Sequence, residues 1–185
     1  MGLPALVEQK NVVAFVTRMK KAADKTDTPR ALLIVALQDL HDAERAWTER
    51  GPQFRSVAGK ALCSFVDDDL TRSASQAAAL RAMLYALEAS VNGDTNIWLR
   101  AILDDAERDS QSIVQGPLLD TALIGAFRKG KQAERVSYET AVALAEKLTL
   151  VDATRQLTDF CAQESAADEE LARLLAATVG SLADA

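Results

Sequence analysis

LLDTALIGAFRKGKQAERVSYETAVALAEKL, residues 118–148, is the most informative part of this sequence for its architecture. Residues recurring every three or four positions form one face of an α-helix. This face consists of Leu119, Leu123, Phe127, Lys131, Glu134, Tyr138, Ala141, Ala145 and Leu148. Lys131 and Glu134 interrupt the apolar pattern near its middle. The stretch therefore predicts a long helix whose inward face carries charged groups at mid-length.

The rest of the chain is also typical of helices, because Ala and Leu dominate and Gly and Pro gather at a few breaks. The expected helices span roughly 4–24, 29–50, 53–91, 95–114, 117–148 and 150–179. The longest of them would each extend about 40 Å or more. The piece between the third and fifth helices is long enough to cross from one end of a bundle to the other. Two antiparallel hairpins joined by such a crossover have the ferritin-like connectivity.

Composition limits the classes of function. The 185 residues are 49% apolar and 26% charged, as in a globular protein, with a formal charge of −6 and a pI near 4.9. This charge argues against a general binder of nucleic acid or of anionic membranes. No apolar run is long enough to span a bilayer, and the first residues lack the pattern of a secretory signal. Two distant cysteines, Cys63 and Cys161, are expected to be reduced thiols of a cytoplasmic protein.

Charged residues also interrupt the apolar faces of the other long helices. The interruptions are Glu44 on the second, Asp69, Arg72 or Ser73, and Gln76 on the third, and Glu164 and Asp168 on the last. A carboxylate buried without a partner costs several kcal/mol, so the bundle centre must supply positive charge. A metal pair could supply it, and so could Arg72 and Lys131. The di-metal bundle pattern needs two Glu-x-x-His pairs, but the chain has none, and its one histidine, His41, precedes Glu44.

Three segments, residues 33–49, 118–148 and 163–174, resemble motifs of the ferritin-like YciE/YciF stress-protein family. The matching residues are Leu37, Asp39, Leu40, Ala43 and Glu44, then Asp120, Ala122, Leu123, Ile124, Ala126, Lys129, Glu134, Tyr138, Thr140 and 144–146, and last Glu164, Ala166, Asp168 and Leu171. His41 stands where a tyrosine is usual in the family. The resemblance covers roughly residues 31–180 and implies an all-α, ferritin-like four-helix bundle with a long crossover.

Two positions depart from the family pattern in a way that bears on function. Lys131 opens the segment where the family has a Glu-His-Tyr-Glu quartet, whose first carboxylate is expected to face the metals. In the preferred alignment Arg72 replaces a second ligand carboxylate, although a one-turn slip would bring Asp68 or Asp69 there instead. A cation is only a hydrogen-bond donor and cannot bind a hard metal.

We therefore weigh two functions. The favoured one is a non-catalytic, structural or partner-binding bundle without a cofactor, and the resemblance associates it with stress. Its centre would hold a buried ionic network of Glu44, Arg72, Lys131, Glu134, Glu164 and Asp168. The alternative is a protein of iron or peroxide handling with a di-iron or di-manganese site. That site would use Glu44, Glu134, Glu164 and Asp168, with His41 or Asp69. If the first function is correct, these residues are the remains of such a site.

The expected organisation is an accessory helix within residues 1–28, a bundle over 29–180 and a tail over 181–185. The accessory helix carries an apolar stripe of Leu6, Val12 or Val13, Val16, Met19 or Lys20, and Ala23. It would pack on the outside of its own bundle or on a second copy. Proteins that resemble this chain commonly pair, so the resemblance implies a homodimer.

Overall fold

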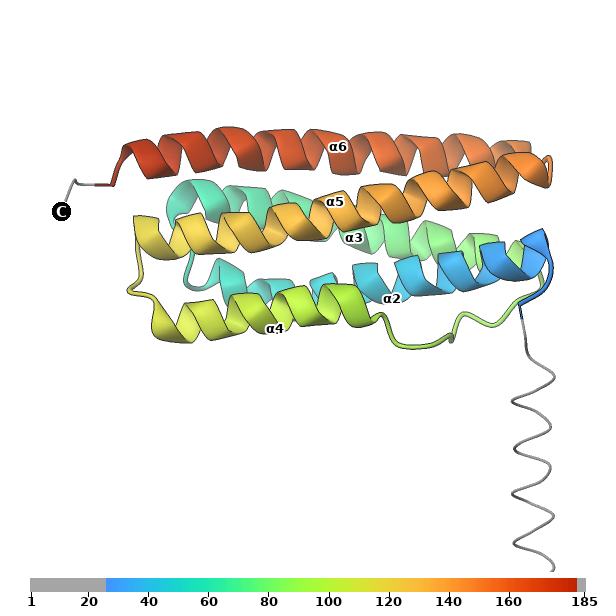
Figure 1. The fold of residues 1–185 in the computed structure, drawn as a ribbon, viewed down its shortest axis with the longest axis horizontal. Coiled ribbons are helices and arrows are strands. Elements are labelled where there is room, and N and C mark those ends of the chain that lie inside the picture. The colour runs from blue at the N-terminus through green and yellow to red at the C-terminus, as the bar shows by residue number, and fades with distance from the viewer. Residues whose placement is uncertain (1–25, 183–185) are drawn as a thin grey trace, which may run out of the picture.

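The structure is a computed structural model that describes residues 26–182 (Figure 1). These residues form α2 (Pro29–Arg55), α3 (Lys60–Ala86), α4 (Ile97–Ser112), α5 (Pro117–Lys147) and α6 (Val151–Gly180). This part of the chain contains no strand, which confirms the all-α prediction. The accessory helix expected over 4–24 lies outside the described residues. None of the described helices is long and apolar enough to cross a membrane.

The four long helices form two antiparallel hairpins, α2 with α3 and α5 with α6 (Figure 1). The segment between α3 and α5 returns the chain to the end of the bundle where α5 begins. Within it, α4 packs along α5 and α2. The predicted ferritin-like topology with a long crossover is therefore confirmed.

Two aspartates of α2 hold the crossover in place. Asp42 Oδ2 accepts from the Asn96 backbone N–H at 2.8 Å, and Asp39 Oδ2 accepts from Trp98 Nε1 at 3.0 Å. Asn96 also caps α4, because its side chain accepts from the Leu99 N–H at 2.8 Å. These contacts fix the start of α4 against the middle of α2.

The predicted end of the first bundle helix, at Gly51-Pro52, is wrong by about one turn. The helix continues through Pro52 to Arg55, and α3 therefore starts at Lys60 rather than near 53. A proline inside a helix lacks the donor to the carbonyl four residues earlier and crowds that carbonyl, so it usually kinks or ends the helix, but α2 continues for one more turn. A Cβ on Gly51 would lie 2.6 Å from Leu70 Cδ2, so the glycine permits close approach of α3 rather than ending α2.

The end of α3 also differs from the prediction, which placed it near residue 91. Glu88 adopts a left-handed conformation with φ of 52°, and the Ala89 N–H donates to the Leu84 carbonyl at 2.9 Å. Thr149 closes α5 in the same way, with φ of 57°. This hydrogen-bonded ending usually places glycine at the left-handed position. Glu88 gives no such signal in the sequence.

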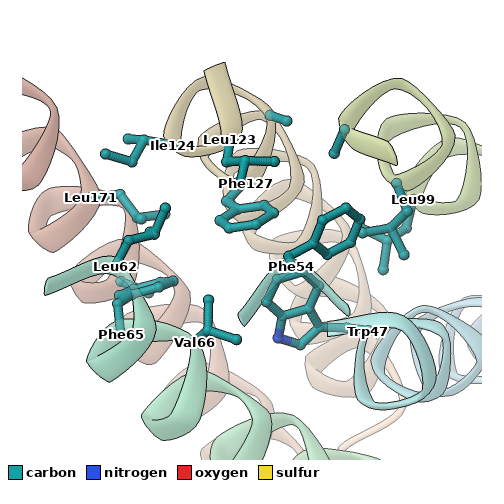
Figure 2. Close-up of a cluster of buried hydrophobic side chains, with 14 of the residues drawn as sticks. Trp47, Phe54, Leu62, Phe65, Val66, Leu99, Leu123, Ile124, Phe127 and Leu171 are labelled. Carbon is teal, nitrogen blue, oxygen red and sulfur yellow. The ribbon is translucent and has the colours of Figure 1, made fainter. Parts of the chain in front are cut away.

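The bundle core consists of two apolar clusters separated along the helices. One cluster contains Trp47, Phe54, Phe65, Val66 and Phe127 near the α2–α3 and α4–α5 connections (Figure 2). The other contains Leu33, Leu37, Leu40, Leu80, Tyr138 and Leu157. Buried polar residues of α3, α5 and α6 lie between the two clusters in sequence, and with buried Glu44 of α2 they form the candidate site.

Candidate functional site: a buried lysine cluster

Lys131 lies at the centre of the buried polar residues. Its Nζ lies 2.8 Å from Glu164 Oε2, 2.9 Å from Glu134 Oε2 and 3.1 Å from Asp69 Oδ2. The Lys131 side chain is only 4% exposed, and the three carboxylates are 1% exposed or less. One ammonium group thus contacts carboxylates from α3, α5 and α6.

Three further polar side chains complete this arrangement. Glu44 Oε1 accepts a hydrogen bond from the Tyr138 hydroxyl at 2.7 Å. Gln76 Nε2 donates to Glu164 Oε1 at 2.9 Å. We call the set of Glu44, Asp69, Arg72, Gln76, Lys131, Glu134, Tyr138 and Glu164 the lysine cluster. It links all four long helices of the bundle.

Arg72 joins the lysine cluster from its edge. Its Nη2 lies 2.9 Å from Asp69 Oδ1, and its side chain is 24% exposed, whereas Asp69 is fully buried. Asp69 therefore lies between two cations, Arg72 and Lys131. Asp68, the other candidate from the alternative alignment, is exposed.

Burial and mutual repulsion change the acidity of these groups. Burial raises the pKa of Glu44 to about 7, and the charge of Glu164 adds to this effect. Burial likewise raises the pKa of Glu134 well above its usual range. Burial alone would lower the pKa of Lys131, but Asp69, Glu134 and Glu164 outweigh it and hold that pKa well above its usual value. Lys131 therefore stays charged.

Charge balance follows from these shifts. Two cations, Lys131 and Arg72, face four carboxyl groups. Protonation of Glu44 and Glu134, whose pKa values are raised, would leave two negative charges against two positive ones. A neutral assembly avoids the large cost of uncompensated charge in a bundle interior.

The structure places Asp168 outside the lysine cluster, which corrects the expectation for that residue. Asp168 Oδ1 accepts from Arg128 Nε at 2.7 Å, and Asp168 Oδ2 accepts from Gln132 Nε2 at 3.2 Å. Its side chain is 20% exposed. A step of four residues on a helix rotates the side chain by about 40° from Glu164. That rotation turns Asp168 toward the edge of α5.

His41 is buried beside the cluster, one turn before Glu44 on α2. Burial lowers the pKa of its imidazole, helped by the charges of Arg45 and Arg81. A neutral imidazole can bind a metal ion. The Lys131 ammonium, however, contacts Asp69, Glu134 and Glu164 and not this ring.

The residues at the bundle centre do not fit a metal pair. Di-metal bundles direct carboxylates from facing helices toward the ions, whereas here the carboxylates of Asp69, Glu134 and Glu164 converge on an ammonium group. Lys131 has three donors and no acceptor, so it repels a metal cation from that position. Within residues 26–182, no three His, Cys, Asp or Glu side chains are arranged to hold a metal ion.

A helical bundle with paired hairpins, a long crossover and charged side chains at its centre defines a ferritin-like protein. The chain belongs to the family described as "Domain of unknown function (DUF892)", whose model matches residues 28–183. This match, together with the structural likeness to YciF, confirms the resemblance to YciE/YciF proteins that the sequence indicates.

Two solved structures share this fold. The Escherichia coli stress protein YciF is 21% identical, with a TM-score of 0.80 over 85% of this chain and 100% of YciF. YcfI from Rhodopseudomonas palustris, for which a structural role has been suggested, is 23% identical, with a TM-score of 0.75 over 87% of this chain and 98% of YcfI. No match was found among curated proteins.

Proposed function

We propose that this chain is a non-catalytic ferritin-like protein with a structural or partner-binding role. In this proposal, Lys131 and Arg72 supply the positive charge that metal ions supply in di-metal bundles. The observation that carries it is the contact of Lys131 Nζ with three buried carboxylates at 2.8–3.1 Å. A role in stress, which is stated for YciF, belongs to the same proposal.

The environment of the Lys131 ammonium supports a structural role for the lysine cluster. The Lys131 ammonium is surrounded by three carboxylates and donates a hydrogen bond to Glu164, and burial excludes it from solvent. Its high pKa disfavours the neutral amine that a nucleophile or general base would need. Removing one partner of a buried ion pair costs roughly 3–5 kcal/mol. The lysine cluster is therefore suited to hold four helices together rather than to transform a substrate.

Metal analysis tests this proposal directly. The full chain would be purified after growth with added iron and manganese, beside the Glu44→Gln and Glu164→Gln variants, and its bound metal measured by mass spectrometry. We expect metal far below one ion per chain in all three proteins. Stoichiometric metal that disappears in both variants would overturn the proposal and favour iron or peroxide handling.

A further inference from the structure

An apolar groove lies at one end of the bundle, between the start of α2, the end of α3 and the start of α6. Its volume is about 500 Å³. Of its apolar lining, Leu33, Leu37, Met83 and Leu157 are buried, whereas Leu87 and Leu150 are partly exposed. Asp152 and Gln156 are the polar residues of its lining. Val151 at this site is 77% exposed. Apolar surface gathered in one concave site marks a place for a partner.

We propose that residues 4–24 of this same chain fill the groove as an amphipathic helix. These residues lie outside the described part of the structure, and they join it at Thr28, the N-cap of α2. Leu33, which lines the groove, is only five residues further on. The link over residues 25–28 spans at most about 14 Å. The segment is therefore tethered at the mouth of the groove.

The chemistry of the segment matches the groove. Leu6, Val13, Val16 and Ala23 recur at helical spacing, so a helix here would offer one apolar face. Its length of 21 residues would extend about 30 Å. Residues 1–25 carry five Lys or Arg and two Asp or Glu, whereas the remaining residues have a net charge of −9. A basic helix and an acidic bundle attract one another.

Covalent attachment favours this occupant over a second copy. A short tether gives an effective concentration in the millimolar range, which a separate chain does not reach at ordinary protein concentrations. The segment is also an addition to the family domain, whose model starts at residue 28.

Disulfide trapping tests the placement. Cysteine replaces Ala82, an exposed alanine of the groove lining, in the full chain with Cys63→Ser and Cys161→Ser. A second cysteine replaces Val13, Val16 or Ala23 in turn. We expect at least one pair to form a disulfide within one chain, which keeps the monomer mass on a non-reducing gel. The control pairs the same positions with Leu118→Cys, which is 57% exposed at the start of α5, and should not crosslink.

Hydrogen exchange provides the second measurement. Val16→Asp places a charge on the apolar face of the segment, and we expect faster amide exchange in residues 79–87 and 150–157. Asn11→Asp, off that face, should leave exchange in both stretches unchanged. The proposal requires both results. It is overturned if no cysteine pair crosslinks, if disulfides form only between two chains, or if Val16→Asp changes nothing in these stretches.

Discussion

Tyr138 of α5 donates a hydrogen bond to Glu44 of α2 across 2.7 Å, and so joins the two helical hairpins at the centre of the bundle. Burial raises the pKa of the Tyr138 hydroxyl well above its usual value, and the nearby Glu44 carboxyl raises it further. The hydroxyl therefore stays protonated, and able to donate, well above neutral pH. Glu44 is thus held by Tyr138, while Asp69, Glu134 and Glu164 are held by Lys131.

Replacement of Lys131 by alanine should strongly destabilise the protein. The change leaves buried carboxylates without their shared cation, at a cost of roughly 3–5 kcal/mol. For a domain of this size, that cost corresponds to a fall in melting temperature on the order of 10 °C. Thermal unfolding followed by circular dichroism measures it. Lys129→Ala is the control, because Lys129 is 65% exposed, and equal melting temperatures for both variants would contradict the prediction.

Reversal of the charge at residue 131 should make stability depend on metal. Lys131→Glu adds a carboxylate to a group that already holds Asp69, Glu134 and Glu164. Divalent cations favour such oxygen ligands, and binding to the folded state alone raises its stability. We expect manganese to raise the melting temperature of this variant, or to restore its helical circular dichroism if it is unfolded. Manganese should leave wild type and Lys129→Glu unchanged, and an unresponsive Lys131→Glu would refute the prediction.

The titration of Glu44 predicts how stability varies with pH. Its pKa is raised from 4.5 to about 7 in the folded protein, so the folded state binds the proton more tightly than the unfolded state. The tighter proton binding contributes to the free energy of unfolding in full below pH 4.5, and this contribution is lost as the pH rises through 7. The loss is about 3 kcal/mol at most. Urea unfolding of wild type between pH 5 and 8 should show this decline.

Glu44→Gln should make that decline less steep, because the amide is neutral throughout the range and can still accept from Tyr138. The matched control is Glu49→Gln, since Glu49 is 49% exposed and pairs with Arg45 on the surface. A Glu44→Gln profile parallel to that of wild type would show that this carboxyl does not carry the effect.

Two acidic residues one turn apart on α6 should differ in their contribution to stability. Glu164→Ala removes a buried partner of Lys131 and should cost several kcal/mol. Asp168→Ala removes a partly exposed pair with Arg128 and should cost about 1 kcal/mol or less. Chemical unfolding of both variants gives the comparison. A larger loss for Asp168→Ala would reverse the assignment of these residues to centre and edge.

The homodimer implied by the family resemblance stays a prediction. Light scattering of the full chain at a concentration of ~50 μM should give twice the chain mass, because pairing of this kind would cover exposed apolar side chains. Exposed Ile97, the first residue of α4, and Val114, just beyond its end, are such residues. A monomer mass at that concentration would exclude a stable dimer.

Periodicity was sufficient to predict the long helices and to place Lys131, Glu134 and Glu164 on inward faces, because a buried face repeats every 3.6 residues. It could not distinguish the centre of that face from its edge, which separates Glu164 from Asp168. It also could not predict that the ammonium of Lys131 reaches Asp69, a contact between residues 62 positions apart that depends on how α3 and α5 are aligned. The end of α2 near Pro52 and the end of α3 near Glu88 depend on local backbone geometry, which these residue types do not indicate.

The position of the lysine cluster between two apolar clusters has a consequence for how the helices can align along the bundle axis. Sliding one helix by a turn, about 5.4 Å, would move its carboxylate away from Lys131; on α6, buried Phe160 or Ala167 would then take the place of Glu164. Apolar contacts alone tolerate such slips, since one leucine layer resembles the next. A buried charge does not tolerate them, because its desolvation is compensated only at one level of the bundle. We therefore expect Lys131 to favour a single axial register for the four helices.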